Sequence, residues 1–286
     1  MNRQLGLTGC DGWIGRPLCQ WLEEAGHTVR VLDDWTRADA RPDVGTCPEP
    51  LDWVLHLGAK TSIEDSWADP FAFYTENLRG TLAALELARS RRAAFLYLSS
   101  YVYGPPQSLP IDESHPAAPT NPYMASKLLG EQACRTIASQ EDLNCVILRA
   151  FNIYGPGLKP GRLISDLLAQ ACAGGPLRLN DPSPRRDYLF INDFCELIQK
   201  IITHPQPESG VFNVGSGESH TNAEVAAVIS ELVGGLPIEV AGQPRPADID
   251  DCTMTPAKAR QAFGWIPTHT LRQGLATLLG AQVETP

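Results

Sequence analysis

The sequence contains no apolar run of membrane-spanning length, and its first residues, MNRQLGLTGCDGW, have no long apolar core of the signal-peptide kind. It also lacks a basic excess, since 23 Lys and Arg stand against 33 Asp and Glu and give a formal net charge of −10. Nucleic acids and anionic membranes need a basic surface, so this charge argues against both as partners. A local basic pocket for a phosphorylated small molecule stays compatible with it.

The cysteines lack the spacing of a metal site. None of the eight is part of a C-x-x-C pair or stands close to a histidine, so no metal is expected. Thiols scattered through a chain of this length are typical of a reducing compartment, where a free cysteine packs as a small core residue. The sequence therefore predicts a soluble cytoplasmic protein.

Apolar runs alternate with helical patterns along the first half of the chain. The runs are QLGLTG, HTVRVLDD, DWVLHLGA, AFLYLSS and CVILRAFNIYG. Strands that are apolar throughout are typical of a parallel sheet buried on both faces. The alternation predicts an α/β fold, a doubly wound parallel (Rossmann) sheet with a smaller C-terminal α/β region that binds substrate.

The same patterns suggest where the two parts meet. Residues 1–155 are expected to form the dinucleotide-binding domain, and residues 188–216, with INDFCELIQKII and GVFNVG, are expected to return to it. Residues 156–187 and 217–286 are expected to form the smaller substrate-binding region. Only a short proline-containing segment lies between Asp33 and Asp52, so the helix and strand normal at this place are expected to be abbreviated.

A glycine-rich turn joins the first expected strand to the first expected helix. In TGCDGWIG, Gly9, Gly12 and Gly15 let the backbone approach a pyrophosphate, which unpaired helix N–H groups then hold; a turn shaped by packing alone is the alternative. Asp33 ends the second strand, where an acid binds the ribose of a dinucleotide. A carboxylate favours NAD because it repels the extra phosphate of NADP, although Arg37 could offset part of that repulsion. Asp43 and Val44 are candidates for the adenine edge, or an ordinary loop.

Two side chains downstream are suited to proton transfer. In NPYMASK, Tyr123 and Lys127 stand four residues apart and so share one face of a helix. An ammonium at about 5 Å is worth roughly 3 kcal/mol at an effective dielectric of about 20, or about 2 pK units. We therefore expect Lys127 to lower the pKa of Tyr123, which could then act as a base without a histidine. His56, within an apolar strand, is expected to be a hydrogen-bonded core residue.

The chain resembles the extended short-chain dehydrogenase/reductase family, in particular its nucleotide-sugar epimerase/dehydratase branch. The resemblance extends from Gly9 to about Gly274. The motifs that carry it are TGCDGWIG, DWVLHLGAK, ENLRGT, LSSYVYG, NPYMASK, LRAFNIYGPG, RRDYLFINDF, FNVGSG and RPADIDD.

The resemblance implies a catalytic set and a binding set. Ser99, four residues before Tyr103, is expected to hydrogen-bond the reacting oxygen, Tyr123 to move the proton, and Lys127 to hold the nicotinamide ribose. The remaining residues implied as cofactor contacts are Trp13, Ile14, Leu57, Gly58 and Ala59. The residues implied as substrate contacts are Lys60, Ser99, Ser100, Asn152, Arg186 and Arg245. Ser100 is also expected to cap the strand end, Asn152 could be structural, and the two arginines could instead pair with Asp187 or Asp248.

These residues indicate an NAD-dependent epimerase of a nucleotide-diphosphate sugar, acting through hydride transfer, most simply at C4. The alternative is a 4-ketoreductase that uses NAD(P)H. Dehydration is less favoured because Ser100 and Tyr101 stand where dehydratases of the family carry acidic residues. A non-catalytic dinucleotide sensor is a further alternative, although such proteins usually lose the tyrosine or the lysine. Helices over 75–89 and 126–138 resemble those of the family's two-fold interface, so a homodimer is expected.

Overall fold

A computed structural model describes residues 2–33, 50–242 and 249–280. Its main sheet is parallel throughout and has the strand order β2-β1-β3-β4-β5-β9. These strands span Gln4–Thr8 (β1), Thr28–Val31 (β2), Trp53–His56 (β3), Ala94–Ser100 (β4), Cys145–Ala150 (β5) and Gly210–Val214 (β9). The predicted doubly wound sheet is confirmed. The expected abbreviation after Asp33 falls on residues 34–49, which lie outside the described residues.

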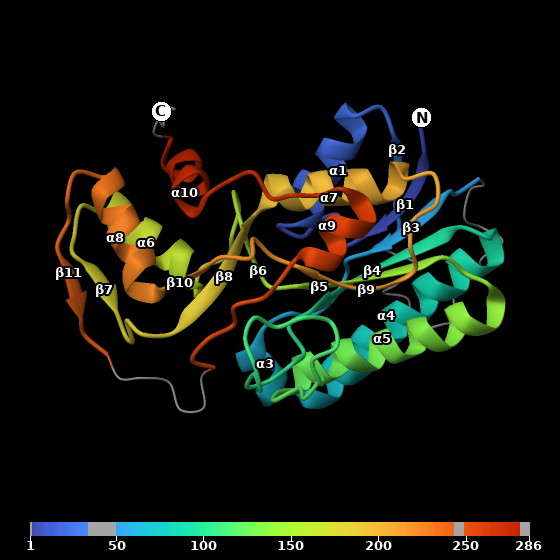
Figure 1. Ribbon diagram of the computed structural model, residues 1–286, viewed down its shortest axis with the longest axis horizontal. Helices are drawn as coiled ribbons and strands as arrows, with labels where there is room; N and C mark the ends of the chain where they lie inside the picture. Colours follow the sequence, from blue (N-terminus) through green and yellow to red (C-terminus); the bar gives the residue numbers. More distant parts are fainter. Residues whose placement is uncertain (1, 34–49, 243–248, 281–286) are drawn as a thin grey trace.

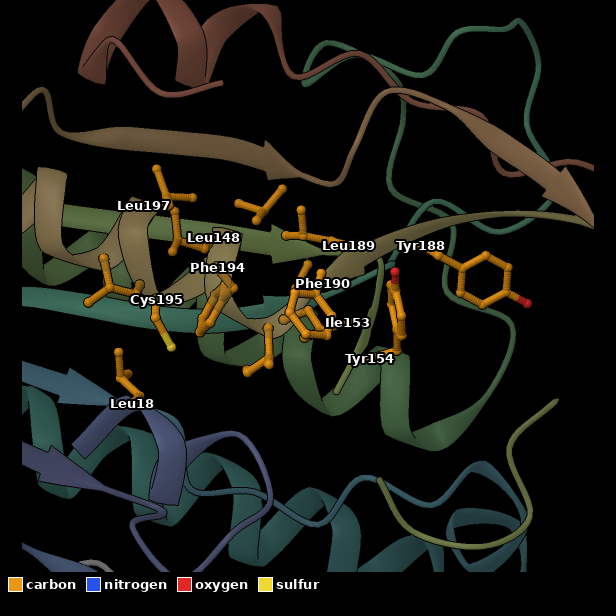
Figure 2. Packing of buried hydrophobic residues seen from close by; sticks show 14 of the residues in the cluster. Leu18, Leu148, Ile153, Tyr154, Tyr188, Leu189, Phe190, Phe194, Cys195 and Leu197 are labelled. Atoms are coloured by element: carbon orange, nitrogen blue, oxygen red, sulfur yellow. The ribbon is translucent and has the colours of Figure 1, made fainter. Parts of the chain in front are cut away.

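Helices cover both faces of this sheet (Figure 1). One face carries α3 (Ile63–Ala68), α4 (Pro70–Arg91) and α5 (Pro122–Glu141), and the other carries α1 (Gly15–Glu24) and α7 (Ile191–Thr203). Figure 2 shows the core beneath α7, where Phe194, Cys195 and Leu197 lie beside Leu148 of β5 and Leu18 of α1. Because both faces are covered, the strands can be apolar along their whole length.

A second group of elements lies beyond one end of the main sheet (Figure 1). It contains β6 (Asn152–Tyr154), α6 (Leu163–Cys172), β7 (Leu177–Leu179), β8 (Arg185–Phe190), β10 (Ser219–Thr221), α8 (Asn222–Leu232), β11 (Ile238–Val240) and α10 (Leu271–Leu279). Its strands form the sheets β10-β8-β6 and β11-β7. After β8, the chain returns to the main sheet through α7 and β9, and α9 (Ala257–Phe263) packs on β9.

The strand order places a ligand site at one edge. β2 and β3 lie on opposite sides of β1, so the connections diverge at the carboxyl ends of β1 and β3. Open α/β sheets bind ligands in the crevice at such a point. Within the described residues, no helix is long and apolar enough to cross a membrane, and no cluster of acidic, histidine or cysteine side chains is arranged to hold a metal ion.

Candidate active site

A cavity of about 1210 Å³ opens along the carboxyl ends of β1, β3 and β4 and continues between the two groups of elements. All of the expected cofactor contacts that the structure describes line it: Gly9, Gly12, Trp13, Ile14, Gly15, Asp33, Leu57, Gly58, Ala59, Tyr123 and Lys127. Asp43 and Val44 lie outside the described residues. The cavity therefore brings together residues from four separate segments of the chain.

The glycine-rich turn is packed so tightly that side chains do not fit in it. Gly9 has a φ of +82°, which disfavours any other residue. A Cβ at Gly15 would lie 1.9 Å from the carbonyl oxygen of Gly9. The turn therefore brings bare backbone to the cavity at the start of α1, which is the arrangement that accepts a pyrophosphate.

Asp33 is fixed against this turn. Its carboxylate accepts a hydrogen bond from the N–H of Gly9 and another, at 3.1 Å, from the N–H of Cys10. The acid expected to bind a ribose thus stands at the wall of the cavity, directly beside the expected pyrophosphate cradle.

His56 ends β3 as a fully satisfied core residue, as predicted. Its Nδ1 lies 2.7 Å from Thr8 Oγ1, its Nε2 lies 3.2 Å from Thr81 Oγ1, and its ring stacks on Tyr97. Burial, with a contribution from the charge of Lys127, lowers the pKa of His56 to about 3. The imidazole therefore stays neutral and takes no part in acid–base chemistry at physiological pH.

The first turn of α5 presents Tyr123 to the cavity. Asn121 caps the helix by accepting a hydrogen bond of 2.9 Å from the N–H of Met124, and Pro122 occupies the first helical position. The phenolic hydroxyl of Tyr123 is hydrogen-bonded to the hydroxyl of Ser100. Burial raises the pKa of Tyr123, and the Ser100 hydrogen bond and the charge of Arg162 oppose that rise.

Lys127 lies one turn further along α5 and is 2% exposed. Its ammonium is 4.3 Å from the centre of the Tyr97 ring. Burial lowers the pKa of Lys127 to about 7. The prediction that Lys127 lowers the pKa of Tyr123 needs correction, because the groups that do so are Ser100 and Arg162, whereas the ammonium is held over Tyr97.

The two serines at the end of β4 face different partners. Ser99, expected to hydrogen-bond the reacting oxygen, is 3% exposed and donates a hydrogen bond of 2.6 Å to Oε1 of Glu131. Ser100, expected to cap the strand and contact substrate, is the residue hydrogen-bonded to Tyr123. Alternation along a strand points neighbouring side chains to opposite faces. Both serines line the cavity, Ser100 is the one that acts on Tyr123, and the catalytic role expected of Ser99 stays a prediction.

The expected substrate contacts that the structure describes also line the cavity. Lys60 lies 3.0 Å from Glu76, and its backbone is held by the buried side chain of Asn77. Asn152 donates a hydrogen bond of 3.1 Å to the carbonyl of Asp187. Arg186 donates to the carbonyls of Arg185 and Ile249. Arg245 lies outside the described residues.

The lining of the cavity is more basic than the whole protein. Seven Lys and Arg face five Asp and Glu in the lining, although the chain has a net charge of −10. The basic residues are Lys60, Arg79, Lys127, Lys159, Arg162, Arg178 and Arg186. This local excess suits a ligand with several negative charges.

Two residues near the reacting hydroxyls were missed from the sequence. Arg162, in the loop before α6, lines the cavity and carries a charge that acts on Tyr123. Nothing in the sequence near Arg162 distinguishes it from a surface arginine. Glu131 contacts Ser99 from within α5. Its position four residues after Lys127, on the buried stripe of the helix, is a signal that could have found it.

The sequence model of the NAD dependent epimerase/dehydratase family matches residues 6–215. A GDP-6-deoxy-D-mannose reductase of Pseudomonas aeruginosa is 29% identical, with 98% of this chain and 97% of the relative covered. A dTDP-glucose 4,6-dehydratase of Xanthomonas campestris is 32% identical, with 79% of this chain and 70% of the relative covered.

Solved structures show the same similarity in three dimensions. The structure of RMD from Pseudomonas aeruginosa, complexed with NADPH, aligns with a TM-score of 0.88 at 29% identity, and 98% of each chain is covered. The Thermus thermophilus UDP-glucose 4-epimerase, complexed with NAD, aligns with a TM-score of 0.81 at 27% identity, covering 98% of this chain and 100% of the other.

Proposed function

The chain belongs to the NAD-dependent epimerase/dehydratase family, and on that premise we propose that it is an NAD-dependent epimerase of a nucleotide-diphosphate sugar. The observation that carries this proposal is the hydrogen bond between Ser100 and Tyr123 at the wall of a cavity that also contains the glycine-rich turn and Lys127. A base, a hydrogen-bond donor and a dinucleotide cradle are the parts that oxidation of a sugar carbinol requires.

The residues present fit a nicotinamide dinucleotide. The turn at Gly9 and Gly15 has no room for a Cβ, so its backbone can approach a pyrophosphate closely. Asp33 supports NAD, because a second phosphate on the ribose would meet its carboxylate. A nicotinamide dinucleotide held by these residues would supply reversible hydride transfer at the carbon of a sugar carbinol.

Residues of the chain itself carry out the proton transfer. Tyr123 takes the proton of the sugar hydroxyl, while the Ser100 hydroxyl donates a hydrogen bond that stabilises the phenolate. The Arg162 charge acts in the same direction. Lys127, at the same wall, holds the nicotinamide ribose. Burial raises the pKa of Tyr123, and Ser100 and Arg162 oppose that rise. By lowering the pKa of the phenol, they favour proton transfer near neutral pH.

The diphosphate of the substrate is held by the basic part of the lining. Arg186 of β8 and Arg178 of β7 lie in the smaller group of elements and line the cavity, and guanidinium groups suit phosphate oxygens. Asn152 and Lys60 also line the cavity, and we assign them as sugar contacts. We assign Arg245 to the same phosphate group from the sequence pattern alone.

A nucleotide-4-keto-sugar reductase is the second candidate. The specific observation in its favour is the similarity over 98% of the chain to a GDP-6-deoxy-D-mannose reductase, together with the similarity to RMD, whose structure was solved with NADPH. The same set of residues serves both reactions, with Tyr123 giving a proton to the carbonyl oxygen in reduction. Dehydration is less supported, because Ser100 is followed by Tyr101, whose hydroxyl donates to the carbonyl of Gly104.

Mass spectrometry of gently denatured protein should release NAD, or NADP for the reductase. A screen of UDP-, GDP- and dTDP-sugars should then find one that is converted into its epimer with no net change in the absorbance of reduced nicotinamide. Net consumption of the reduced cofactor with a keto sugar would instead identify the reductase. Absence of both cofactor binding and sugar-nucleotide conversion would contradict both candidates.

The exposed apolar side chains of α4 and α5 support a homodimer. Phe71, Tyr74 and Leu82 of α4 are 78, 36 and 44% exposed, and Leu129 of α5 is 46% exposed. Residues 71, 74 and 82 share one face of α4, next to α5. We propose that this face packs against the same face of a second copy of the chain. Light scattering should give the mass of a dimer for the native chain and of a monomer for Leu82→Glu/Leu129→Glu, whereas Val240→Glu on β11 should stay dimeric.

The free cysteines support a location in the cytoplasm. Cys10, Cys19, Cys134, Cys145, Cys172, Cys195 and Cys252 are free among the described residues. Unpaired cysteines are typical of a reducing compartment. Cell fractionation should place the protein with cytoplasmic markers, and recovery from an oxidising compartment would contradict this assignment.

A further inference from the structure

Glu131 is a fully buried carboxylate that joins α5 to the main sheet. Arg149 of β5 binds both of its oxygens, with Nε 2.9 Å from Oε1 and Nη2 2.7 Å from Oε2. Ser99 of β4 donates to Oε1 at 2.6 Å, and Arg135, which is about half exposed, donates to Oε2 at 3.1 Å. With both oxygens occupied, the carboxylate has one fixed orientation.

The register of the sheet explains why these groups meet. Ser99 pairs with Arg149 of β5, and Arg149 pairs with Asn213 of β9, so the three side chains form a row on one face. The following row is Ser100, Ala150 and Val214, on the opposite face. Because Glu131 of α5 holds this first row, the strand end that carries Ser100 is fixed where both serines line the cavity.

The turn after β4 is tied to the same row. The Arg149 guanidinium lies 4.8 Å from the centre of the Tyr103 ring, and the Tyr103 hydroxyl donates a hydrogen bond of 2.6 Å to Oδ1 of Asn213. Ser100 thus lies between Ser99 and Tyr103, both of which contact the row of polar side chains. Its backbone is restrained from both sides.

The helix carries the other reacting hydroxyl on the same stripe. Tyr123, Lys127 and Glu131 follow one another at intervals of four residues and so lie on one face of α5. The groups facing Lys127 are His56 of β3, Tyr97 of β4, and Glu131 and Cys134 of α5. Of these, Cys134 and Glu131 act to raise the pKa of Lys127, against the effect of burial.

We propose that Glu131 is a positioning residue, which fixes the end of β4 through Ser99 and Arg149 so that the Ser100 hydroxyl meets Tyr123, and which holds its negative charge toward Lys127. This inference rests on the proposed function only for its effect on turnover. The placement of Ser100 beside Tyr123 by Glu131 does not depend on which substrate the protein binds.

Stability alone does not account for this group of charges. Burying a carboxylate and a guanidinium costs several kcal/mol each in desolvation, and well-packed apolar residues of similar volume are often as stable or more so. A buried pair does supply a fixed geometry, because any other arrangement leaves a charge without a partner. The Glu131–Arg149 pair contacts Ser99, the residue before Ser100, so the fixed geometry of this pair affects the hydroxyl proposed to assist proton transfer.

The test uses the full-length protein loaded with NAD, with UDP-glucose as the first probe of turnover and the sugar nucleotide found by the screen as the second. In Glu131→Gln we expect kcat to fall about 10- to 100-fold, the effect of a misplacement near 1 Å, with KM and NAD affinity changed less than 3-fold. The alkaline limb of the kcat profile should move to lower pH, because Lys127 loses the charge that supports its ammonium. Ser99→Ala should lower kcat without moving that limb.

Arg135→Gln is the matched control, since it removes a half-exposed partner of the same carboxylate while Arg149 still binds both oxygens. It should keep kcat within about 2-fold. A purely structural role for Glu131 would lower Tm and leave the pH profile unmoved, and that result would overturn the proposal. If Glu131→Gln does not fold, wild-type turnover by Ser99→Ala would overturn it equally.

Crystal structures of Glu131→Gln and Ser99→Ala separate this inference from the proposed function. We expect Ser100 Oγ to leave hydrogen-bonding distance of the Tyr123 hydroxyl in at least the first variant. If the wild type converts no sugar nucleotide, the proposed function fails while this geometric readout still stands. Unchanged Ser100–Tyr123 contacts in both variants would refute the positioning role.

Discussion

The Ser99 hydroxyl donates a hydrogen bond of 2.6 Å to Oε1 of Glu131, on the side of β4 that packs against α5. Its neighbour Ser100 is hydrogen-bonded to Tyr123 at the cavity. A carboxylate therefore stands beside the serine and tyrosine cluster of LSSYVYG. In the proposed scheme this carboxylate orders the end of β4, and the phenol of Tyr123 transfers the proton.

Tyr123→Phe should abolish most turnover while leaving the cofactor bound. Loss of a positioned acid–base group costs about 10²- to 10⁴-fold, and the remaining ring keeps its packing against Phe73. Steady-state kinetics and retained cofactor by mass spectrometry check this. Tyr74→Phe, on the exposed face of α4, should behave as the wild type. Turnover within 3-fold of the wild type in Tyr123→Phe would remove the tyrosine from the mechanism.

Lys127→Met should inactivate the enzyme and make it more stable at neutral pH. Burial lowers the pKa of Lys127 to about 7 in the folded chain, against about 10.5 unfolded, so between these values the unfolded chain binds more protons. Wild-type stability then rises with pH across that window. The advantage of Lys127→Met should be largest at and below pH 7, at most about 5 kcal/mol, and should shrink toward pH 10.

Thermal unfolding from pH 6 to pH 10 measures this difference. Lys200→Met removes an exposed lysine that pairs with Glu196 on α7 and should show no such pH dependence relative to the wild type. A constant difference between Lys127→Met and the wild type over the whole range would mean that Lys127 titrates normally.

Gly130→Ala should destabilise the fold, because the helix packs directly on Tyr97. An added Cβ would lie 2.3 Å from the Tyr97 hydroxyl oxygen and 2.7 Å from Cζ. Overpacking of this kind costs about 1–3 kcal/mol, and in a chain of this size each kcal/mol lowers Tm by about 2–4 °C. Gly175→Ala, which enters open space, should leave Tm unchanged. An unaltered Tm in Gly130→Ala would contradict the packing of α5 on β4.

Asp33→Ala should weaken NAD binding more than NADP binding. The substitution removes the acceptor for the N–H groups of Gly9 and Cys10 together with the expected ribose contact. We expect NAD affinity to fall about 10-fold or more, the effect of losing one or two charge-assisted hydrogen bonds. Fluorescence titration with both reduced cofactors measures it, with the exposed Glu208→Ala as control. Equal losses for the two cofactors would argue against Asp33 as the group that selects NAD.

The fold could be read from local patterns. Strands β1, β3, β4 and β5 are mostly apolar on both faces, and α7 has a clear apolar stripe, so a parallel sheet covered on both faces could be predicted from these patterns. The parts of the site that depend only on spacing within one helix or one turn could be predicted from the sequence. Tyr123 and Lys127 are one turn apart in any helix, and Gly9 and Gly15 meet in any tight strand–helix turn.

Contacts between distant segments could not be read in this way. Whether Lys127 approaches Tyr123 or Tyr97 depends on how α5 sits on β4, and the described structure places its ammonium over Tyr97. Arg162 reaches the neighbourhood of Tyr123 from a loop 39 residues further along the chain, a distance in sequence over which no periodicity holds.

By itself, the sequence determined the chemistry of the site, because the residue types and their spacing within one helix or one turn are local properties of the chain. Only the tertiary structure decided which serine hydroxyl acts on Tyr123. Strand alternation states that Ser99 and Ser100 face opposite sides, but the pairing of β4 with β5 and the buried Glu131–Arg149 pair choose the side. That choice is made by residues up to 50 positions apart, whose contacts exist only in the folded chain.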